Sequence, residues 1–153
     1  MDVIVDLQGF WKPDNVFVLK EIAVLPLGTE TPFVYQFAAP SPWRDLPLSY
    51  QRKNRWLERH YHGLRWSSGT LPYNTVKDVL TPLLKEASRV YVKGRDKIIW
   101  LRHLLTDLDT PIEDLEELHC PSLRKLQSTC EYHSEYTTSA AENVKRLAKW
   151  LQR

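Results

Sequence analysis

The sequence predicts one α/β domain in which helices cover a mixed β-sheet. Three observations support this class: strand-like segments come first in the chain, segments with helical periodicity follow, and a strand pattern returns before the last helices. Short connections separate the early strand segments and suit an antiparallel meander, because a parallel crossover needs about a dozen residues or more. A chain of 153 residues is long enough to bury a single core.

The predicted strands are short runs rich in β-branched and aromatic residues. Asp14-Asn15 gives a turn signal before the second run, and Gly94 closes the fourth. The five predicted strands are Val3–Val5, Val16–Leu25, Phe33–Phe37, Arg89–Lys93 and Ile112–Leu115. We expect the first three to form the meander and the later ones to add parallel strands.

The predicted helices carry apolar residues at three- and four-residue spacing or are rich in good helix formers. They cover Tyr50–His62, Asn74–Ala87, Lys97–Leu105, a short segment that begins at Pro121, and the C-terminal segment. The C-terminal helix has the clearest start signal, because Ser139 and Glu142 form a capping box. Its apolar stripe consists of Val144, Leu147, Ala148 and Leu151.

This order, with an aspartate at the end of the stretch VIVD, resembles the RNase H-like fold and, within it, the DEDDh 3′–5′ exonucleases. That family carries Asp-x-Glu on its first strand, and VIVDLQG looks like this motif at Asp6 and Gln8. The stretch RVYVKGRDKIIWLRHL stands where the next metal-binding acid is expected, with Asp96 available. The stretch YHSEYTTSAAENVKRLAKWL is similar to the His-x4-Asp motif around His133. The resemblance implies Asp6, Asp96 and His133 as catalytic residues, with Mg²⁺ or Mn²⁺ as cofactor.

The departures from that pattern favour a domain that has lost catalysis. Gln8 replaces the second acid of the first motif, Lys97 lies beside Asp96, and Thr138 stands where an aspartate is expected. An amide, a lysine and a hydroxyl cannot supply the negative charge that holds two divalent ions about 4 Å apart. The leading hypothesis is therefore a catalytically degenerate domain that binds RNA or another nucleic acid, or a protein. An active metal-dependent 3′–5′ exonuclease, with Glu142 as a further acid, is the alternative.

A second resemblance concerns zinc. The Maelstrom family of RNase H-like domains lacks the acidic set and carries a Glu-Cys-His-Cys zinc constellation, and this chain has a similar group. The residues are Cys120, Cys130 and His133, with His119 as an optional fourth. Nitrogen and sulfur ligands of this kind suit tetrahedral zinc. The alternative interpretation is two ordinary buried thiols.

The stretch YQRKNRWLERHYHGLRW is the strongest positional signal for a partner. It is basic, with Glu58 as its only acid, and aromatic residues alternate with the cations. The candidate nucleic-acid-binding residues are Arg52, Lys53, Arg55, Trp56, Arg59 and Arg65. Cations neutralise phosphates and aromatic rings stack on unpaired bases, so the pattern predicts a single-stranded nucleic acid as partner. The alternative is an amphipathic helix with a solvated basic face.

The remaining features limit the class of protein without naming a partner. Six acids between Asp107 and Glu117 predict a solvated acidic rim or a docking surface for a basic partner. A purely structural interaction domain that uses exposed tryptophans such as Trp11, Trp43 or Trp100 is the third functional hypothesis. No run approaches the ~20 apolar residues that cross a bilayer, no basic segment opens the chain, and two cysteines make no disulfide framework. We therefore expect an intracellular protein with no membrane partner, in the nucleus or the cytoplasm.

Overall fold

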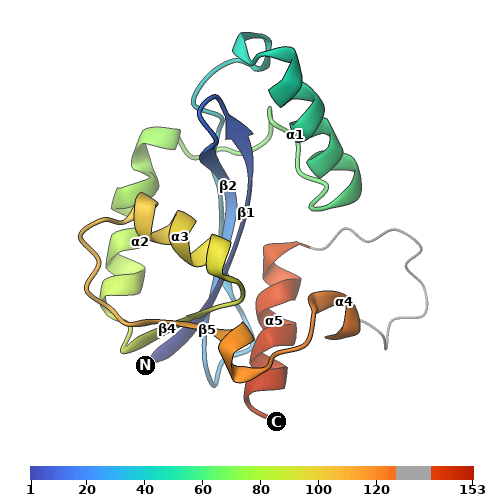
Figure 1. Cartoon of the computed structure of the whole chain (residues 1–153). Coiled ribbons are helices and arrows are strands. Elements are labelled where there is room, and N and C mark those ends of the chain that lie inside the picture. The colour runs from blue at the N-terminus through green and yellow to red at the C-terminus, as the bar shows by residue number, and fades with distance from the viewer. Residues whose placement is uncertain (127–138) are drawn as a thin grey trace.

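A five-stranded mixed sheet forms the centre of the molecule (Figure 1). This computed structural model describes residues 1–126 and 139–153. The strands are β1 (Asp2–Lys12), β2 (Val16–Pro26), β3 (Phe33–Gln36), β4 (Arg89–Val92) and β5 (Ile112–Asp114), in the spatial order β3-β2-β1-β4-β5. β1, β2 and β3 pair antiparallel, whereas β4 pairs parallel to both β1 and β5. The predicted α/β class, with a meander extended by parallel strands, is confirmed.

Helices cover both faces of the sheet. They are α1 (Leu48–His60), α2 (Val76–Lys85), α3 (Arg95–Leu104), α4 (Leu123–Leu126) and α5 (Ala140–Leu151), with 3₁₀ turns η1 (Trp43–Asp45), η2 (Tyr73–Thr75) and η3 (Leu115–Leu118). In Figure 1, α2 and α3 lie on one side of the long β1–β2 hairpin and α1 and α5 lie on the other. None of the helices in the described ranges is long and apolar enough to cross a membrane.

The alternation of side chains along β1 decides what each face contains. Val3, Val5 and Leu7 belong to the apolar cluster under α2 and α3. Ile4 belongs to the cluster under α5, and Phe10 packs with residues around α1. Because side chains alternate along a strand, the residues between Ile4 and Phe10 on the same face are Asp6 and Gln8. Both are buried, so two polar side chains interrupt an otherwise apolar row.

A β-bulge interrupts the β1–β2 ladder next to these residues. Gln8 pairs with Glu21 and Gly9 pairs with Leu19, so Lys20 has no partner residue on β1. A Cβ atom on Gly9 would lie 2.0 Å from the carbonyl oxygen of Val18, which explains why a glycine stands there. The extra residue leaves Lys20 and Glu21, two consecutive charged residues, both buried.

The start of α5 agrees with its predicted capping box. Ser139 is the N-cap, and its hydroxyl accepts a hydrogen bond of 3.2 Å from the backbone N–H of Glu142. The carboxylate of Glu21 adds a second cap from β2, because its Oε1 accepts a hydrogen bond of 2.8 Å from the N–H of Ala140. These two caps fix the first turn of α5 over the polar part of the sheet.

Candidate functional site

Asp6 lies at the centre of a buried polar cluster. Its side chain is 2% exposed, and Oδ1 accepts a hydrogen bond of 2.5 Å from the ammonium group of Lys97. Oδ2 accepts one of 2.9 Å from Nδ2 of Asn143 and one of 3.2 Å from Nε2 of Gln8. The four side chains therefore form one group in which every hydrogen bond is directed at the single carboxylate.

Three different elements bring the cluster together. Asp6 and Gln8 come from the central strand β1. Lys97 lies in the first turn of α3, which follows β4 directly through Gly94, a residue with φ of 107°. Asn143 lies in the first turn of α5, whose start is fixed by the two caps described above. The contacts join residues 91 and 137 positions apart in the chain, so the cluster also ties α3 and α5 to the sheet.

The electrostatics of the cluster centre on one buried ion pair. Burial is the largest single effect on the pKa of Lys97 and would lower it, but the charge and hydrogen bond of Asp6, together with Tyr61, outweigh burial and the net pKa is raised. Lys97 therefore stays protonated and cancels the charge of Asp6. Its ammonium also lies 5.9 Å from the centroid of the Tyr61 ring, at the end of α1.

The donor set does not fit Mg²⁺ or Mn²⁺. These ions prefer carboxylate and other hard oxygen ligands, and the cluster offers one carboxylate that an ammonium group already contacts. Glu21, another buried acid on this face, is occupied as well: Oε1 caps α5, and Oε2 accepts 2.7 Å from Nε2 of Gln36. Residues 1–126 and 139–153 contain no group of three His, Cys, Asp or Glu side chains that could hold a metal ion.

Two oxygen atoms of the cluster have no hydrogen-bond partner within the described ranges. They are Oε1 of Gln8 and Oδ1 of Asn143, and both are buried. Since both amides donate to Asp6 through their nitrogen atoms, the amide oxygens are turned away from the carboxylate. The two amide groups are thus hydrogen-bonded to Asp6 through their nitrogen atoms, and their oxygen atoms could still accept hydrogen bonds on the side away from Asp6.

The three residues predicted to be catalytic do not lie together in the described structure. Asp6 is at the centre of the cluster, but its partner from α3 is Lys97, and Asp96 is exposed. The prediction that Asp96 supplies an acid beside Asp6 is therefore not supported, because the first turn of α3 directs the next residue inward. His133 lies outside the described residues, as does Cys130.

The two other proposed zinc ligands do not lie in similar surroundings. Cys120 is buried among the apolar residues under α5, where burial raises the pKa of its thiol. His119 is exposed and ends η3 in a left-handed conformation with φ of 66°. A buried thiol of raised pKa is a poor thiolate donor, so the described part of the group resembles a core cysteine more than a metal ligand.

Asn143 is the site residue that the sequence analysis missed. It occupies a buried position of α5 together with Ala140, Val144 and Leu147. A polar residue on the apolar face of an amphipathic helix is unusual, and that irregularity was the available signal.

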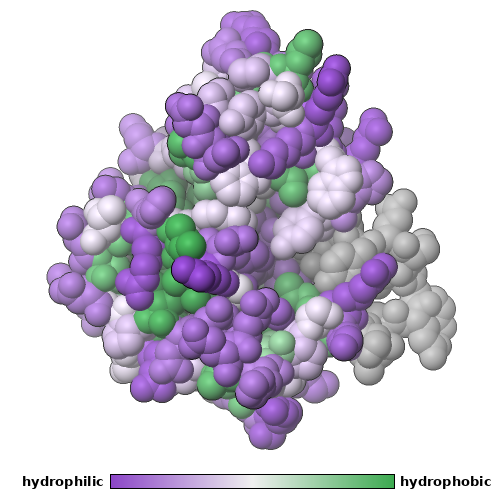
Figure 2. Space-filling model, viewed as in Figure 1, coloured by the Kyte–Doolittle hydropathy of each residue, from purple (hydrophilic) through white to green (hydrophobic). Residues whose placement is uncertain are grey.

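The basic-aromatic segment forms an exposed surface on α1. Buried Asn54 anchors the helix, because its Oδ1 accepts 2.9 Å from the N–H of Trp11 and its Nδ2 donates 2.8 Å to the carbonyl of Trp11. The predicted nucleic-acid-binding residues Arg52, Lys53, Arg55, Trp56, Arg59 and Arg65 are all exposed, and Trp56 has an exposed fraction of 57%. In Figure 2, strongly hydrophilic residues lie among pale ones over the upper part of the molecule, where Figure 1 places α1.

Two cations of this surface lie against aromatic rings. The ammonium of Lys53 is 4.6 Å from the ring centroid of Trp11, and the guanidinium carbon of Arg55 is 5.6 Å from that of Trp43. Three tryptophans that the sequence analysis took as exposed are half-buried: Trp11, Trp43 and Trp100. Trp11 and Trp100 pack edge to face at 5.2 Å, which explains part of their burial.

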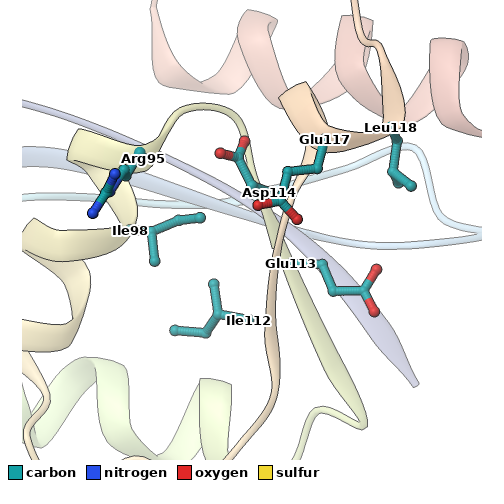
Figure 3. A pocket seen from close by; sticks show the side chains of 7 residues that line it. All are labelled: Arg95, Ile98, Ile112, Glu113, Asp114, Glu117 and Leu118. Carbon is teal, nitrogen blue, oxygen red and sulfur yellow. The ribbon is translucent and has the colours of Figure 1, made fainter.

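The acidic segment borders a hollow of about 550 Å³ beside the ends of β4 and β5 (Figure 3). It is lined by Arg95, Ile98, Ile112, Glu113, Asp114, Glu117 and Leu118. Two of its carboxylates already have structural roles. Asp114 accepts 2.9 Å from the N–H groups of Gly94 and of Glu116, and Glu113 pairs with Arg89 at 3.4 Å. The acidic side chains thus border this hollow, and none of its lining residues belongs to the Asp6 cluster.

No protein-family model matches the chain, and no curated protein matches it. The fold and the site define an α/β domain whose central-strand aspartate is neutralised internally by a lysine.

Proposed function

We propose that this chain is an RNase H-like domain of the DEDDh exonuclease type that has lost metal-dependent hydrolysis and binds single-stranded nucleic acid. The observation that carries the proposal is the ammonium group of Lys97, which lies 2.5 Å from Asp6 where a metal-binding site would need further acids.

The arrangement of the cluster supports the relationship to such enzymes. They carry an Asp-x-Glu pair on the first strand, one acid at a later strand-to-helix junction and one in the last helix. By their contacts, the corresponding residues would be Asp6 and Gln8 on β1, Lys97 after β4 and Asn143 in α5. Lys97 and Asn143 then take the positions that the sequence motifs gave to Asp96 and Thr138. The four positions then converge on one point, although three of them no longer carry an acid.

The charge of the cluster explains why hydrolysis would be lost. Four carboxylates would attract two divalent cations, whereas one carboxylate, one ammonium and two amides have no net charge. A metal ion at this point would have to displace Lys97 and would then find one carboxylate, because the oxygens of both amides are turned away from Asp6. That is too little negative charge for the metal pair that positions the attacking and leaving oxygens.

The α1 surface supports the binding role. Its cations are exposed and alternate with aromatic side chains, including Trp56, and its only acid is Glu58. Single strands expose both phosphates and base faces, which this combination can contact together. Each neutralised phosphate releases counterions, so the affinity should fall steeply as salt increases. The logarithm of the binding constant should fall with the logarithm of the salt concentration, with a slope of about −0.7 for each phosphate contacted.

The test is a fluorescence-anisotropy titration of a 5′-labelled single-stranded RNA, run in Mn²⁺ and in chelator and over a range of salt. We expect equal binding with and without metal, a steep salt dependence and intact RNA. The double variant Arg52→Gln/Arg59→Gln should weaken binding, while Lys145→Gln/Lys149→Gln, which removes two exposed charges from α5, should not.

Two results would contradict the proposal. Shortening of the RNA that disappears in Asp6→Ala would mean that the domain is an active nuclease. Absence of RNA binding, together with a protein partner that a pull-down retains after nuclease treatment, would favour a structural interaction domain instead.

A further inference from the structure

A second hollow, of about 220 Å³, lies on the side of α1 that faces η1 and the following loop. Its lining residues are Trp43, Arg55, Glu58, Arg65, Trp66 and Ser67. We name it the Trp43 hollow. Its volume is below the roughly 300–1,000 Å³ of pockets that hold drug-sized ligands, so it suits a single flat ring system.

The walls of the Trp43 hollow are held in place from below. The indole N–H of Trp66 donates 2.9 Å to the carbonyl of Ser41, and Trp66 is 6% exposed. The ammonium of Lys20, buried at the β2 bulge, donates to the carbonyl oxygens of Trp66, at 2.6 Å, and Ser68. The ring of Trp43 packs against that of Trp66 at 5.9 Å. A hollow fixed in this way does not have to order its walls when a ligand enters, which favours binding.

The chemistry of the lining matches the parts of a nucleotide. Trp43 provides a half-buried aromatic face, and the guanidinium of the exposed Arg55 lies over it at 5.6 Å. A base that stacks on this face would displace the Arg55 guanidinium from the ring. Glu58 provides a carboxylate, which only accepts hydrogen bonds. Arg65 lies at 4.0 Å from that carboxylate, and its side chain is 79% exposed, so it can also contact a phosphate.

We propose that the Trp43 hollow binds one unpaired guanine of the single strand, an inference that rests on the proposed function. The base stacks on Trp43, its N1–H and N2–H groups donate to the two oxygens of Glu58, and Arg55 and Arg65 contact the adjacent phosphates. Guanine is the base that presents two neighbouring donors on one edge, which a carboxylate can accept together. Adenine and cytosine present one amino group beside an acceptor, and uracil presents one N–H between two carbonyl groups.

The experiment compares three labelled single-stranded RNAs that differ at one central position: all uridine, one guanosine, and one inosine. Inosine keeps N1–H and lacks the 2-amino group. A bidentate contact to a base discriminates by roughly 1–3 kcal/mol, so the guanosine strand should bind about 5- to 150-fold more tightly than the uridine strand. The inosine strand should lie between them.

The matched variants are Glu58→Gln and Glu30→Gln, which remove the same charge from the hollow and from an exposed position in the β2–β3 connection. Glu58→Gln should remove the guanosine preference and leave the affinity for the uridine strand equal or higher, because a negative charge is lost. Glu30→Gln should keep the preference.

The possible outcomes separate this inference from the proposed function. Equal affinity for all three strands would overturn the guanine site and leave a nonspecific single-strand binder. A guanosine preference that survives in Glu58→Gln would show that the base is recognised elsewhere. Failure of all three strands to bind would overturn the proposed function and the guanine site together.

Discussion

Replacing Lys97 by methionine tests whether the Asp6 cluster is a neutralised buried site. Methionine keeps an unbranched apolar stem in place and removes the ammonium group. The side chains of Asp6 and Lys97 are 2% and 10% exposed, so the pair belongs to the buried class rather than the surface class. Breaking a buried pair by removing one partner costs about 3–5 kcal/mol, because the other charge remains unpaired. That is a large part of a typical folding free energy of roughly 5–15 kcal/mol.

The double variant Asp6→Asn/Lys97→Met isolates the interaction. Asp6→Asn alone leaves a buried ammonium without its carboxylate and should also lose about 3–5 kcal/mol. Both charges are absent in the double variant, so its loss should be smaller than that of either single variant, at roughly 2 kcal/mol or less. The two substitutions are therefore expected to couple strongly.

Urea unfolding followed by circular dichroism gives the four free energies of this cycle. Arg89→Met serves as the control, because Arg89 pairs with Glu113 at 3.4 Å and the two side chains are 46% and 41% exposed. Exposed ion pairs contribute little to stability, because water and salt screen the two charges. A Lys97→Met protein as stable as Arg89→Met, or additive losses in the double variant, would refute the buried-pair account. Mn²⁺ should not raise the stability of the wild-type protein, since a ligand bound to the folded state would do so.

Three further predictions concern His62, the bulge between β1 and β2, and the start of α5. Burial lowers the pKa of His62 to about 4, and its Nε2–H donates 2.9 Å to the carbonyl of Gly9 while Nδ1 accepts 3.0 Å from the N–H of Leu64. The unfolded chain binds a proton at this histidine near pH 6.5 and the folded chain near pH 4, so the free energy of unfolding should fall by about 3 kcal/mol as the pH is lowered across that window. Urea denaturation at a series of pH values should show this loss in the wild-type protein and not in His62→Gln. Gly9→Ala should lower the free energy of unfolding in urea by roughly 1–3 kcal/mol through its clash with Val18, and an unchanged value would contradict the tight bulge. Ser139→Ala should cost about 1 kcal/mol in the same assay, whereas Ser139→Asp should retain the cap.

Secondary structure was predictable wherever a local pattern determined it. The five strands and the helices lie where runs of β-branched residues, apolar spacing and the Ser139 capping box placed them. The main error of extent is β1, which was expected at Val3–Val5 and continues to Lys12. Asp6 and Gln8 interrupt its apolar run, and a buried strand with polar residues at its centre does not show the periodicity that sequence reasoning relies on.

The candidate site was predictable at one residue and not at its partners. Asp6 was found because it directly follows the apolar run Val3–Val5, although the structure places it near the centre of β1 and not at the end of the strand. Lys97 and Asn143 reach it from 91 and 137 residues away, and their contact depends on the rotation of α3 and α5 about their axes. Lys97 lies four residues before Leu101 and Asn143 four residues before Leu147, so spacing alone puts both on the buried side of their helices. Spacing does not show that two helices so far apart in the chain meet at the same residue of β1.

The bulge at Lys20 has a consequence for how β2 tolerates change in length. On the sheet face that α1 and α5 cover, the β2 residue before the bulge is even-numbered, Val18, whereas the residues after it are odd-numbered, such as Ala23. Leu19 faces the opposite side of the sheet. Deleting one residue from an ordinary strand inverts every side chain beyond it. Deleting Lys20 would instead restore regular alternation and leave the rest of β2 in phase, while removing the ammonium that supports the Trp43 hollow. This strand can therefore lose a residue without losing its place in the sheet.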